Sequence, residues 1–369
     1  MKLLYITSLS GKRVNGFMRS AILAAKQLGF EFVMACNTNG SDKEGYEEDC
    51  KSYGIRLEHI CFNRNPFSSQ NIKAYQQLLE LMKKEHFDIV HCNTPIGGLL
   101  GRICARKTKI PCVIYMAHGF HFWKGAPIKN WLLYYPVELF LSKWTDVLIT
   151  ITQEDFELSK KMKAKRNSYI HGVGIDLSNF VRRKSADRNV ELRNELAIPT
   201  DAIVLLSVGE LNKNKNQKIV IRAISELKRT DVYYVICGEG ELFDEYKVLT
   251  QKLGISDKVV MTGFRSDVYE FYRMADCYIH PSIREGLPAS IVEAMATGVP
   301  VLATDFRGIR DIIPNRERLF DSSSISDTVR VLNNWLNESS DDSEQENGVV
   351  DYYNLDSVVN EFVRLYKSI

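Results

Sequence analysis

The sequence predicts an α/β fold made of two doubly wound, parallel-sheet domains of similar size. Its 369 residues exceed the usual size of one domain, and 45% of them are hydrophobic, an ordinary share for a globular protein. Short runs rich in β-branched residues alternate with longer amphipathic stretches, which is typical of parallel strands joined by helices. The alternation pauses at a charged segment, residues 180–189, and then starts again.

In the first half, apolar runs that begin almost at the first residue predict the strands. These are Lys2 to Ile6, Phe32 to Cys36, Ile89 to Cys92, Cys112 to Met116 and Val147 to Ile151. Two amphipathic stretches predict helices between strands, Met18 to Leu28 and Ile72 to Lys84. We therefore expect a parallel sheet with helices on both faces.

The second half repeats this pattern. Its predicted strands are Ile203 to Val208, Val232 to Cys237, Val259 to Met261, Cys277 to His280 and Val299 to Ala303. Phe180 to Asn189, charged and poor in apolar residues, is the best candidate for an interdomain linker. We expect a solvated loop at Asn337 to Gly348 and a last amphipathic helix at Leu355 to Tyr366. The predicted domains are residues 1–178 and 179–369.

Charge is distributed unevenly along the chain. The net charge is +2, yet residues 1–180 hold 24 Lys/Arg and 16 Asp/Glu, against 24 and 30 in the rest. A basic half suits an anionic membrane surface or a phosphate-bearing acceptor, although charge also fluctuates by chance. The run Lys160 to Arg166 predicts either a membrane contact or a solvated helix end. We expect no nucleic-acid partner.

The cysteines and the N-terminus bear on location. None of the eight cysteines forms a C-x2-C pair, and several lie in strand-like runs such as Val235-Ile-Cys237, which predicts buried thiols in a reducing compartment. The chain begins directly with a strand, without an export signal, and no later run of about 20 residues is uncharged and apolar. We expect a cytoplasmic protein, at most peripheral to a membrane.

The most informative segment lies between Glu285 and Glu293. It opens as a Gly/Pro loop and continues as the helix-forming run Ala289 to Thr297, so one carboxylate lies on a loop and the other in the helix that follows. Free N–H groups near a helix start bind phosphate, and carboxylates beside them bind hydroxyls. This is the chemistry of a nucleotide-sugar site. The loop residues predicted to bind the donor are Gly286, Leu287, Pro288 and Ala289.

The spacing resembles the E-x7-E signature of retaining family 4 glycosyltransferases, and the flanking Pro281-Ser282 and Glu293-Ala-Met-Ala-Thr-Gly298 strengthen the match. The resemblance implies a GT-B architecture: two Rossmann-like domains with a cleft between them, the acceptor on the first domain and the nucleotide sugar mostly on the second. It also implies that the last helix packs back on the first domain. Glu285 would hold the donor sugar and Glu293 the ribose.

The segment Gly209 to Asn216 follows a predicted strand and carries two lysines ahead of a helix. It resembles the family's G-R-L-x-x-x-K segment, which aligns Gly209 with the turn and Lys215 with the lysine that binds the diphosphate. The family's arginine position holds Glu210, and Lys213 is the candidate for the missing positive charge. Without the resemblance, these lysines would be solvated loop charges.

In the first half, His118-Gly-Phe-His-Phe122 follows a predicted strand. A histidine there can donate to a sugar hydroxyl or interact with developing charge. The string resembles the H-G motif of family 4, in its bacterial capsule and exopolysaccharide branch, and this implies that His118 contacts the donor sugar. His121 stays ambiguous. Phe120, Phe122 and Trp123 either line an acceptor surface or pack in the core.

Other loops after strands offer weaker candidates. Gly16 precedes the first helix, as in the family's donor-contacting loop, and Arg265 lies in the loop that the family places at the nucleobase. Gly238-Glu-Gly240 would allow close backbone approach, and His91 to Pro95 ends another strand. The glycines of His171 to Asp176 suit a hinge.

No His/Cys cluster has zinc spacing, no D-x-D pair follows a strand, and no G-x-S-x-G, G-x-G-x-x-G or P-loop string is present. The sequence therefore predicts a reaction without a metal ion or a cofactor. The resemblance implies a retaining transferase, which moves a hexose or N-acetylhexosamine from a UDP-linked donor to a lipid-linked or growing saccharide. The alternatives are a UDP-sugar epimerase of the same plan and a catalytically silent nucleotide-sugar-binding subunit, which Glu210 would favour.

Overall fold

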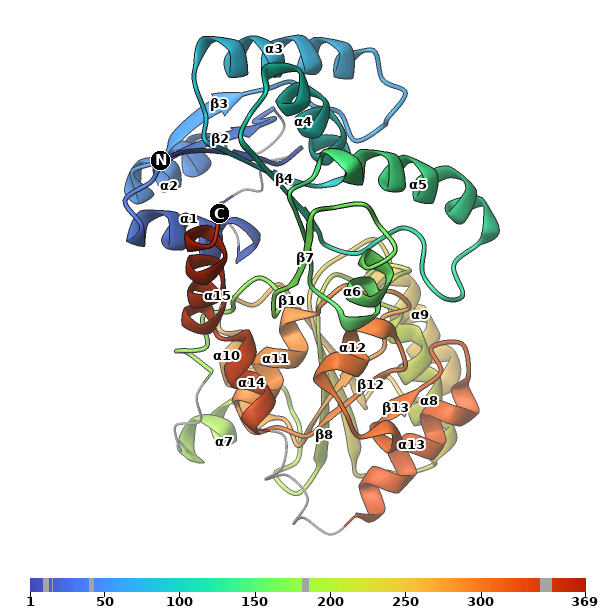
Figure 1. Cartoon of the computed structure of the whole chain (residues 1–369). Coiled ribbons are helices and arrows are strands. Elements are labelled where there is room, and N and C mark those ends of the chain that lie inside the picture. Colours follow the sequence, from blue (N-terminus) through green and yellow to red (C-terminus); the bar gives the residue numbers. More distant parts are fainter. Residues whose placement is uncertain (9–12, 15, 40–42, 181–185, 339–346) are drawn as a thin grey trace. The chain divides into compact units, whose positions relative to one another are not determined.

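The computed structural model describes residues 1–8, 13–14, 16–39, 43–180, 186–338 and 347–369. The chain divides into two compact units, Met1–Gly174 with Leu355–Ile369, and Ile175–Asn354 (Figure 1). The division falls at Gly174 rather than at residue 178, and the last helix belongs to the first unit. Of the predicted linker, residues 181–185 lie outside the described part, and a helix already begins at Ala186.

The first unit contains a seven-stranded parallel sheet in the order β3-β2-β1-β4-β5-β6-β7. Its strands are β1 Lys2–Ile6, β2 Glu31–Cys36, β3 Arg56–His59, β4 Ile89–Asn93, β5 Cys112–Ala117, β6 Val147–Thr150 and β7 Arg166–Tyr169. The two edge strands, β3 and β7, were not predicted. Both are short and polar, as edge strands usually are, so they lack the apolar runs that mark the central strands.

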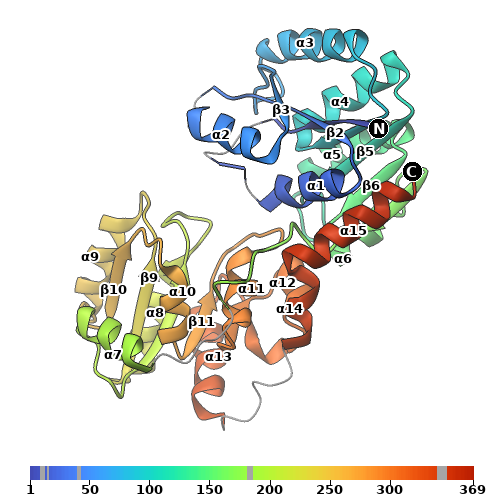
Figure 2. The same ribbon diagram turned by 90° about the vertical axis from the view of Figure 1, so that its left-hand side faces the viewer.

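Helices cover both faces of this sheet. They are α1 Gly16–Gln27, α2 Lys43–Tyr53, α3 Gln70–Lys84, α4 Pro95–Thr108, α5 Ile128–Leu141, α6 Gln153–Ser159 and α15 Leu355–Lys367, with the short helix η1 Ser142–Trp144. Alternate residues of the strands, such as Leu4 and Ile6, pack with α3 and α4 in one core cluster. On the other face α15 lies alongside α1 (Figure 2), and its Tyr366 hydroxyl is 2.8 Å from His91 Nδ1.

The second unit contains a six-stranded parallel sheet in the order β10-β9-β8-β11-β12-β13. Its strands are β8 Ile203–Val208, β9 Val232–Cys237, β10 Val259–Gly263, β11 Cys277–His280, β12 Val301–Thr304 and β13 Leu319–Phe320. Its helices are α7 Ala186–Glu195, α8 Gln217–Leu227, α9 Phe243–Leu253, α10 Val268–Met274, α11 Ala289–Ala296, α12 Arg307–Ile312, η2 Arg316–Arg318, α13 Ile325–Asn337 and α14 Asn347–Tyr353. Of the predicted polar loop, residues 339–346 lie outside the described part.

Both faces of the second sheet are buried, because successive strand residues enter different core clusters. Val204 and Leu206 pack on the side of α10 and α11, whereas Leu205 packs on the side of α8 and α13. Every predicted strand of this half is present, with limits that differ by at most two residues. Near-continuous apolar runs of this kind are expected of strands in a buried parallel sheet.

The order of strands reverses once in each sheet, between β1 and β4 in the first and between β8 and β11 in the second. At such a switch point the following loops leave toward opposite faces, and ligands bind beyond the carboxyl ends of the strands there. The predicted site residues follow these strands or their neighbours. Among the described residues, no helix combines the length and apolar content needed to cross a bilayer.

Candidate active site

In the second unit, the loops that follow β8 and β11 are tied together at the switch point. Asn214 Nδ2 donates to the backbone oxygen of Arg284 over 3.0 Å, and the Ile283 N–H donates to the Asn214 oxygen over 2.8 Å. Asn216 adds a donor bond of 2.9 Å to the Ser322 oxygen. The first two bonds join segments about 70 residues apart in sequence, and the third adds a segment 106 residues from Asn216.

The result is direct contact between two predicted ligand groups. Lys215 Nζ lies 2.7 Å from Glu285 Oε1, and both side chains are mostly buried. His280, the last residue of β11, places Nε2 3.6 Å from the same carboxylate oxygen. The predicted phosphate-binding cation and the predicted sugar-binding carboxylate therefore form one cluster with a histidine that the sequence analysis did not select.

The charge state of this cluster follows from its surroundings. Burial alone would raise the pKa of Glu285, but the contact with His280 and the charge of Lys215 outweigh it and lower the pKa to about 2. Burial lowers the pKa of His280, and Glu285 opposes this. At neutral pH the cluster thus holds an ammonium and a carboxylate beside an imidazole that burial keeps neutral, since burial disfavours the charged form.

Glu293 lies in α11 and is set apart from that cluster. Its Oε2 accepts a hydrogen bond of 3.1 Å from the Tyr272 hydroxyl of α10, which also reaches the Ser290 oxygen at 3.1 Å. Burial raises the pKa of Glu293, and the bond from Tyr272 partly offsets the shift. The pKa shifts of the two glutamates are therefore opposite in direction.

The loop between them leads into α11 with Pro288 as the N-terminal cap residue. Leu287 and Ala289 pack against the core, which fixes the backbone of the loop. Proline has no N–H, so Gly286, Leu287 and Ala289 supply the backbone donors that the sequence analysis assigned to this stretch. Helix starts leave such N–H groups without an intrahelical acceptor and suit anions.

Two glycines let the β8 loop approach its neighbour. Gly209 has φ +147° and donates its N–H to the Cys237 oxygen over 2.9 Å. A side chain at Gly238, φ +155°, would place Cβ 1.9 Å from the Gly209 oxygen, so only glycine fits there. The tripeptide Gly238-Glu-Gly240, a weak candidate in sequence, therefore shapes the turn that carries Lys215.

The cluster does not include Arg265, Lys213 or Glu210, the residue at the family's arginine position. Arg265 forks onto Asp267, with Nη2–Oδ2 at 2.7 Å, and lies over the Phe271 ring at 4.8 Å. Glu210 is exposed and accepts from Asn212 Nδ2 at 2.9 Å, while Lys213 is exposed. A donor role for the Arg265 side chain, and a phosphate role for Lys213, stay predictions.

The first unit holds His118, just beyond β5. Its Nε2 lies 2.9 Å from Oδ1 of Asn93, the last residue of β4. Since an amide oxygen only accepts, this contact places the proton of the neutral ring on Nε2. Burial lowers the pKa of His118 to about 4, although part of the residue reaches solvent. His118 is thus a neutral hydrogen-bonding group at pH 7, not an imidazolium.

The aromatic residues beside His118 are mostly structural. Phe120 and Phe122 are buried and stack with ring centroids 4.9 Å apart, and Phe122 packs against Trp131 of α5. Of the two alternatives, packing in the core is therefore correct for both Phe120 and Phe122. His121 is exposed and packs on Tyr134, with ring centroids 4.6 Å apart. Gly16 is the first residue of α1, and residues 9–12 of the predicted donor loop lie outside the described part.

The low pKa of His118 predicts a pH dependence of stability. Between pH 6.5 and 4 His118 is protonated in the unfolded chain but stays neutral in the folded protein. The free energy of unfolding therefore falls as the pH falls. In His118→Gln this decline should be shallower, by up to about 1.4 kcal/mol per pH unit. Urea unfolding at pH 7, 6 and 5 measures it. Equal slopes in both proteins would contradict the assigned pKa.

Sequence reasoning missed three residues that contact the predicted groups, namely His280, Asn93 and Tyr272. His280 met the criterion used for His118, since it ends a predicted strand, and Asn93 lies in the His91 to Pro95 segment already noted as ending a strand. Tyr272 gave no signal because it lies on α10, 21 residues before its partner Glu293. Among the described residues, no group of three or more metal-ligating side chains comes together.

Comparison with known proteins agrees with this geometry. Residues 2–152 match the family model for glycosyl transferase 4-like domains, and residues 189–348 match the model for glycosyl transferases group 1. The chain is 42% identical over 301 residues to the putative glycosyltransferase EpsD of Bacillus subtilis (strain 168), covering 80% of this chain and 76% of the relative.

Two further proteins are similar. One is the UDP-Gal:alpha-D-GlcNAc-diphosphoundecaprenol alpha-1,3-galactosyltransferase of Escherichia coli, 28% identical over 316 residues, which are 83% of this chain and 79% of that one. The other is Anabaena HepE, whose crystal structure in complex with UDP matches with a TM-score of 0.81 at 18% identity over the whole of both chains. The chain therefore belongs to the family 4 glycosyltransferases of the GT-B fold, in their bacterial exopolysaccharide and capsule branch.

Proposed function

We propose that this glycosyltransferase moves a hexose or an N-acetylhexosamine from a UDP-linked donor to a lipid-linked or growing saccharide acceptor, with retention at the anomeric carbon and without a metal ion. The observation that carries the proposal is the Lys215–Glu285 pair at the switch point of the second sheet, 2.7 Å apart. The printed name of the Escherichia coli relative, with its UDP-Gal donor and diphosphoundecaprenol acceptor, and the UDP bound to HepE support the donor and acceptor classes.

Each group in the second unit has a task that fits its chemistry. The Lys215 ammonium and the N–H groups of Gly286, Leu287 and Ala289 would bind the diphosphate and stabilise it as it leaves, the electrostatic contribution that often dominates catalysis. Glu285, ionised at every physiological pH, would accept from donor-sugar hydroxyls. Glu293 would hold the ribose hydroxyls from within α11.

In the proposed reaction, the bond between the anomeric carbon and the diphosphate oxygen breaks. The acceptor oxygen bonds to that carbon on the same face, and its proton passes to the leaving phosphate. No protein nucleophile is needed on this route. His118, neutral at pH 7 and held by Asn93 through Nε2, would contact the donor sugar near the reacting centre. We place the reaction in surface polysaccharide synthesis on the cytoplasmic side of the membrane.

A panel of nucleotides and nucleotide sugars, scored by thermal stabilisation, tests the donor. Because a ligand that binds only the folded protein stabilises it by mass action, UDP at about a hundred times its Kd should add about 2.7 kcal/mol. We expect a rise in Tm with UDP and with one UDP-sugar, and a smaller one in Glu293→Gln.

The outcomes separate the alternatives. A shift with GDP or ADP compounds alone would overturn the uridine assignment. Binding of UDP with no transfer to any acceptor would favour the silent subunit, an alternative supported by Glu210 at the family's arginine position. Conversion of a UDP-sugar into its epimer without acceptor would indicate the epimerase.

A further inference from the structure

Helix α5 presents a stripe of large apolar side chains to solvent. Ile128 is 77% exposed, Leu132 72%, Leu133 62%, Val137 48% and Phe140 51%. Successive members lie four, one, four and three residues apart, which spreads them over about half of the helix circumference. Contiguous apolar surface of this kind marks a protein or membrane contact.

Other residues of α5 anchor the helix in the first unit. Trp131, Tyr135 and Leu139 pack against the core cluster. Glu138, the one acidic residue in α5, is buried and accepts from Arg102 Nη2 at 3.0 Å. The exposed stripe therefore lies on a fixed helix and carries no carboxylate.

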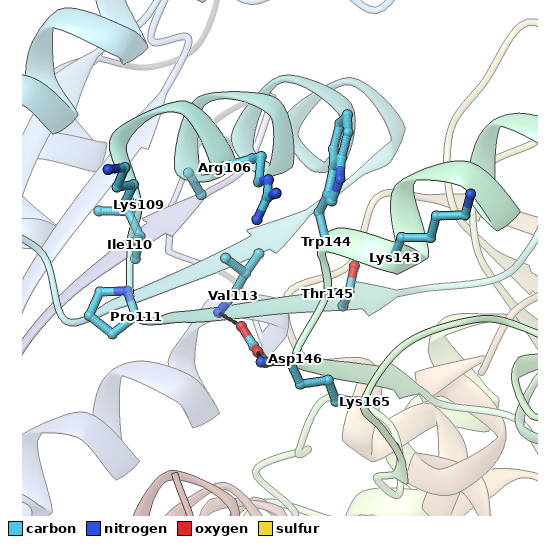
Figure 3. A pocket seen from close by; sticks show the side chains of 11 residues that line it. Arg106, Lys109, Ile110, Pro111, Val113, Lys143, Trp144, Thr145, Asp146 and Lys165 are labelled. Atoms are coloured by element: carbon cyan, nitrogen blue, oxygen red, sulfur yellow. Dashed lines mark hydrogen bonds and ion pairs between the residues drawn. The ribbon is translucent and has the colours of Figure 1, made fainter.

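A cationic cavity lies between the end of α4 and η1 (Figure 3). Its volume is about 270 Å³. The residues that give it its character are Arg106 and Lys109 from the end of α4, Lys143 and Trp144 from η1, and Lys165 from the segment before β7. The Trp144 ring lies 4.9 Å from the Phe140 ring, and Lys143 Nζ lies 5.5 Å above the same ring, so stripe and cavity are continuous.

The charge of this surface is strongly positive. The cavity lining contains four cations, Arg106, Lys109, Lys143 and Lys165, and one acid, Asp146. Asp146 is paired with Lys165 at 2.6 Å. Within the described part of the chain, Arg106, Lys109 and Lys143 have no carboxylate partner.

We propose that this surface docks the enzyme on an anionic lipid bilayer, with the α5 stripe in the interface and the cavity cations at the lipid phosphates. The layers match those of a bilayer surface: apolar side chains for the acyl boundary, an aromatic ring at the headgroup level, and cations for the anionic phosphates. A second copy of the chain would cover the stripe but would leave the cations without counter-charges, because the copy is equally basic there.

The basic run Lys160 to Arg166 is a weaker membrane contact. Lys160 Nζ lies 2.6 Å from Glu157 Oε1, and Lys165 Nζ lies 2.6 Å from Asp146 Oδ1. Two of its charges are thus neutralised by the protein itself. We therefore assign the membrane contact to α5 and the cavity rather than to this run.

The test is co-sedimentation of the full chain with vesicles, a readout that does not depend on transferase activity. We expect binding to vesicles of phosphatidylglycerol and phosphatidylcholine in equal parts, weak binding to phosphatidylcholine alone, and loss in high salt. Leu132→Gln with Leu133→Gln should weaken binding at least about ten-fold by removing apolar insertion. Arg106→Gln, Lys109→Gln and Lys143→Gln should each weaken it about five-fold.

The matched control is Phe67→Gln with Ile72→Gln, two residues of the same unit that are 92% and 64% exposed and lie just before and at the start of α3. It should bind vesicles like the wild type, and all variants should keep the wild-type circular dichroism and Tm. No binding of the wild type to anionic vesicles at low salt would overturn the proposal. So would equal losses in the α5 and control variants, or a dimer in solution that Leu132→Gln with Leu133→Gln dissociates.

Discussion

Lys215→Met is expected to lower kcat by about 10²- to 10³-fold, the usual loss when one electrostatic stabiliser of a transition state is removed. Lys215 is the cation placed against Glu285, and methionine keeps the length of the chain without its charge. Initial rates of the purified enzyme, at saturating donor and acceptor, measure the effect. The free energy of unfolding should change by little more than about 1 kcal/mol, since part of the pair reaches solvent.

The chain offers a matched control three residues further on. Lys218 Nζ also lies 2.7 Å from a glutamate, Glu245, but this pair is exposed on α8 and α9, away from the cluster. Lys218→Met should keep near wild-type turnover. If both variants retained similar rates, the diphosphate role of Lys215 would be wrong. Loss of turnover in Lys215→Met together with an unchanged Kd for UDP would place its effect on the leaving step.

Glu138→Ala is expected to destabilise the first unit by about 3 to 5 kcal/mol, the cost of leaving one partner of a buried ion pair without the other. Arg102 is 1% exposed, donates through Nε to the Gly98 oxygen at 2.8 Å, and lies 4.0 Å from the Tyr115 ring centre. Because the Arg102 guanidinium is held in the core by these contacts, it cannot reach solvent when Glu138 is removed, and its charge stays buried without a partner.

Urea unfolding followed by tryptophan fluorescence measures this loss, because Trp123, Trp131 and Trp144 lie in the first unit and Trp335 alone lies in the second. Glu157→Ala is the control: its partner Lys160 is exposed, so the loss should stay below about 1 kcal/mol. Arg102→Met combined with Glu138→Leu should recover most of the stability, since apolar groups of similar volume replace such pairs well. Equal losses in Glu138→Ala and Glu157→Ala would show that the pair is not buried in solution.

Much of the architecture could be predicted from local patterns. Strands such as Lys2–Ile6 and Ile203–Val208 were predicted with their observed limits, because a buried strand in a parallel sheet needs a continuous apolar run. The predicted linker was wrong at its C-terminal end, because α7 already begins at Ala186. The charged residues there form a helix because Leu192 of the same helix is buried in the core of the second unit. Composition alone does not show that burial.

The sequence by itself determined the two parallel-sheet units, the loops that follow their strands, and the residues Lys215, Glu285, Glu293 and His118 on or beside those loops. Only the tertiary structure decided that Lys215 meets Glu285 and His280, that Glu293 meets Tyr272 instead, and that α5 leaves its apolar face in solvent. The physical reason is the range of the interactions. Periodicity and turn chemistry depend on neighbours along the chain, whereas a contact between Lys215 and Glu285 depends on β8 and β11 pairing across about 70 residues.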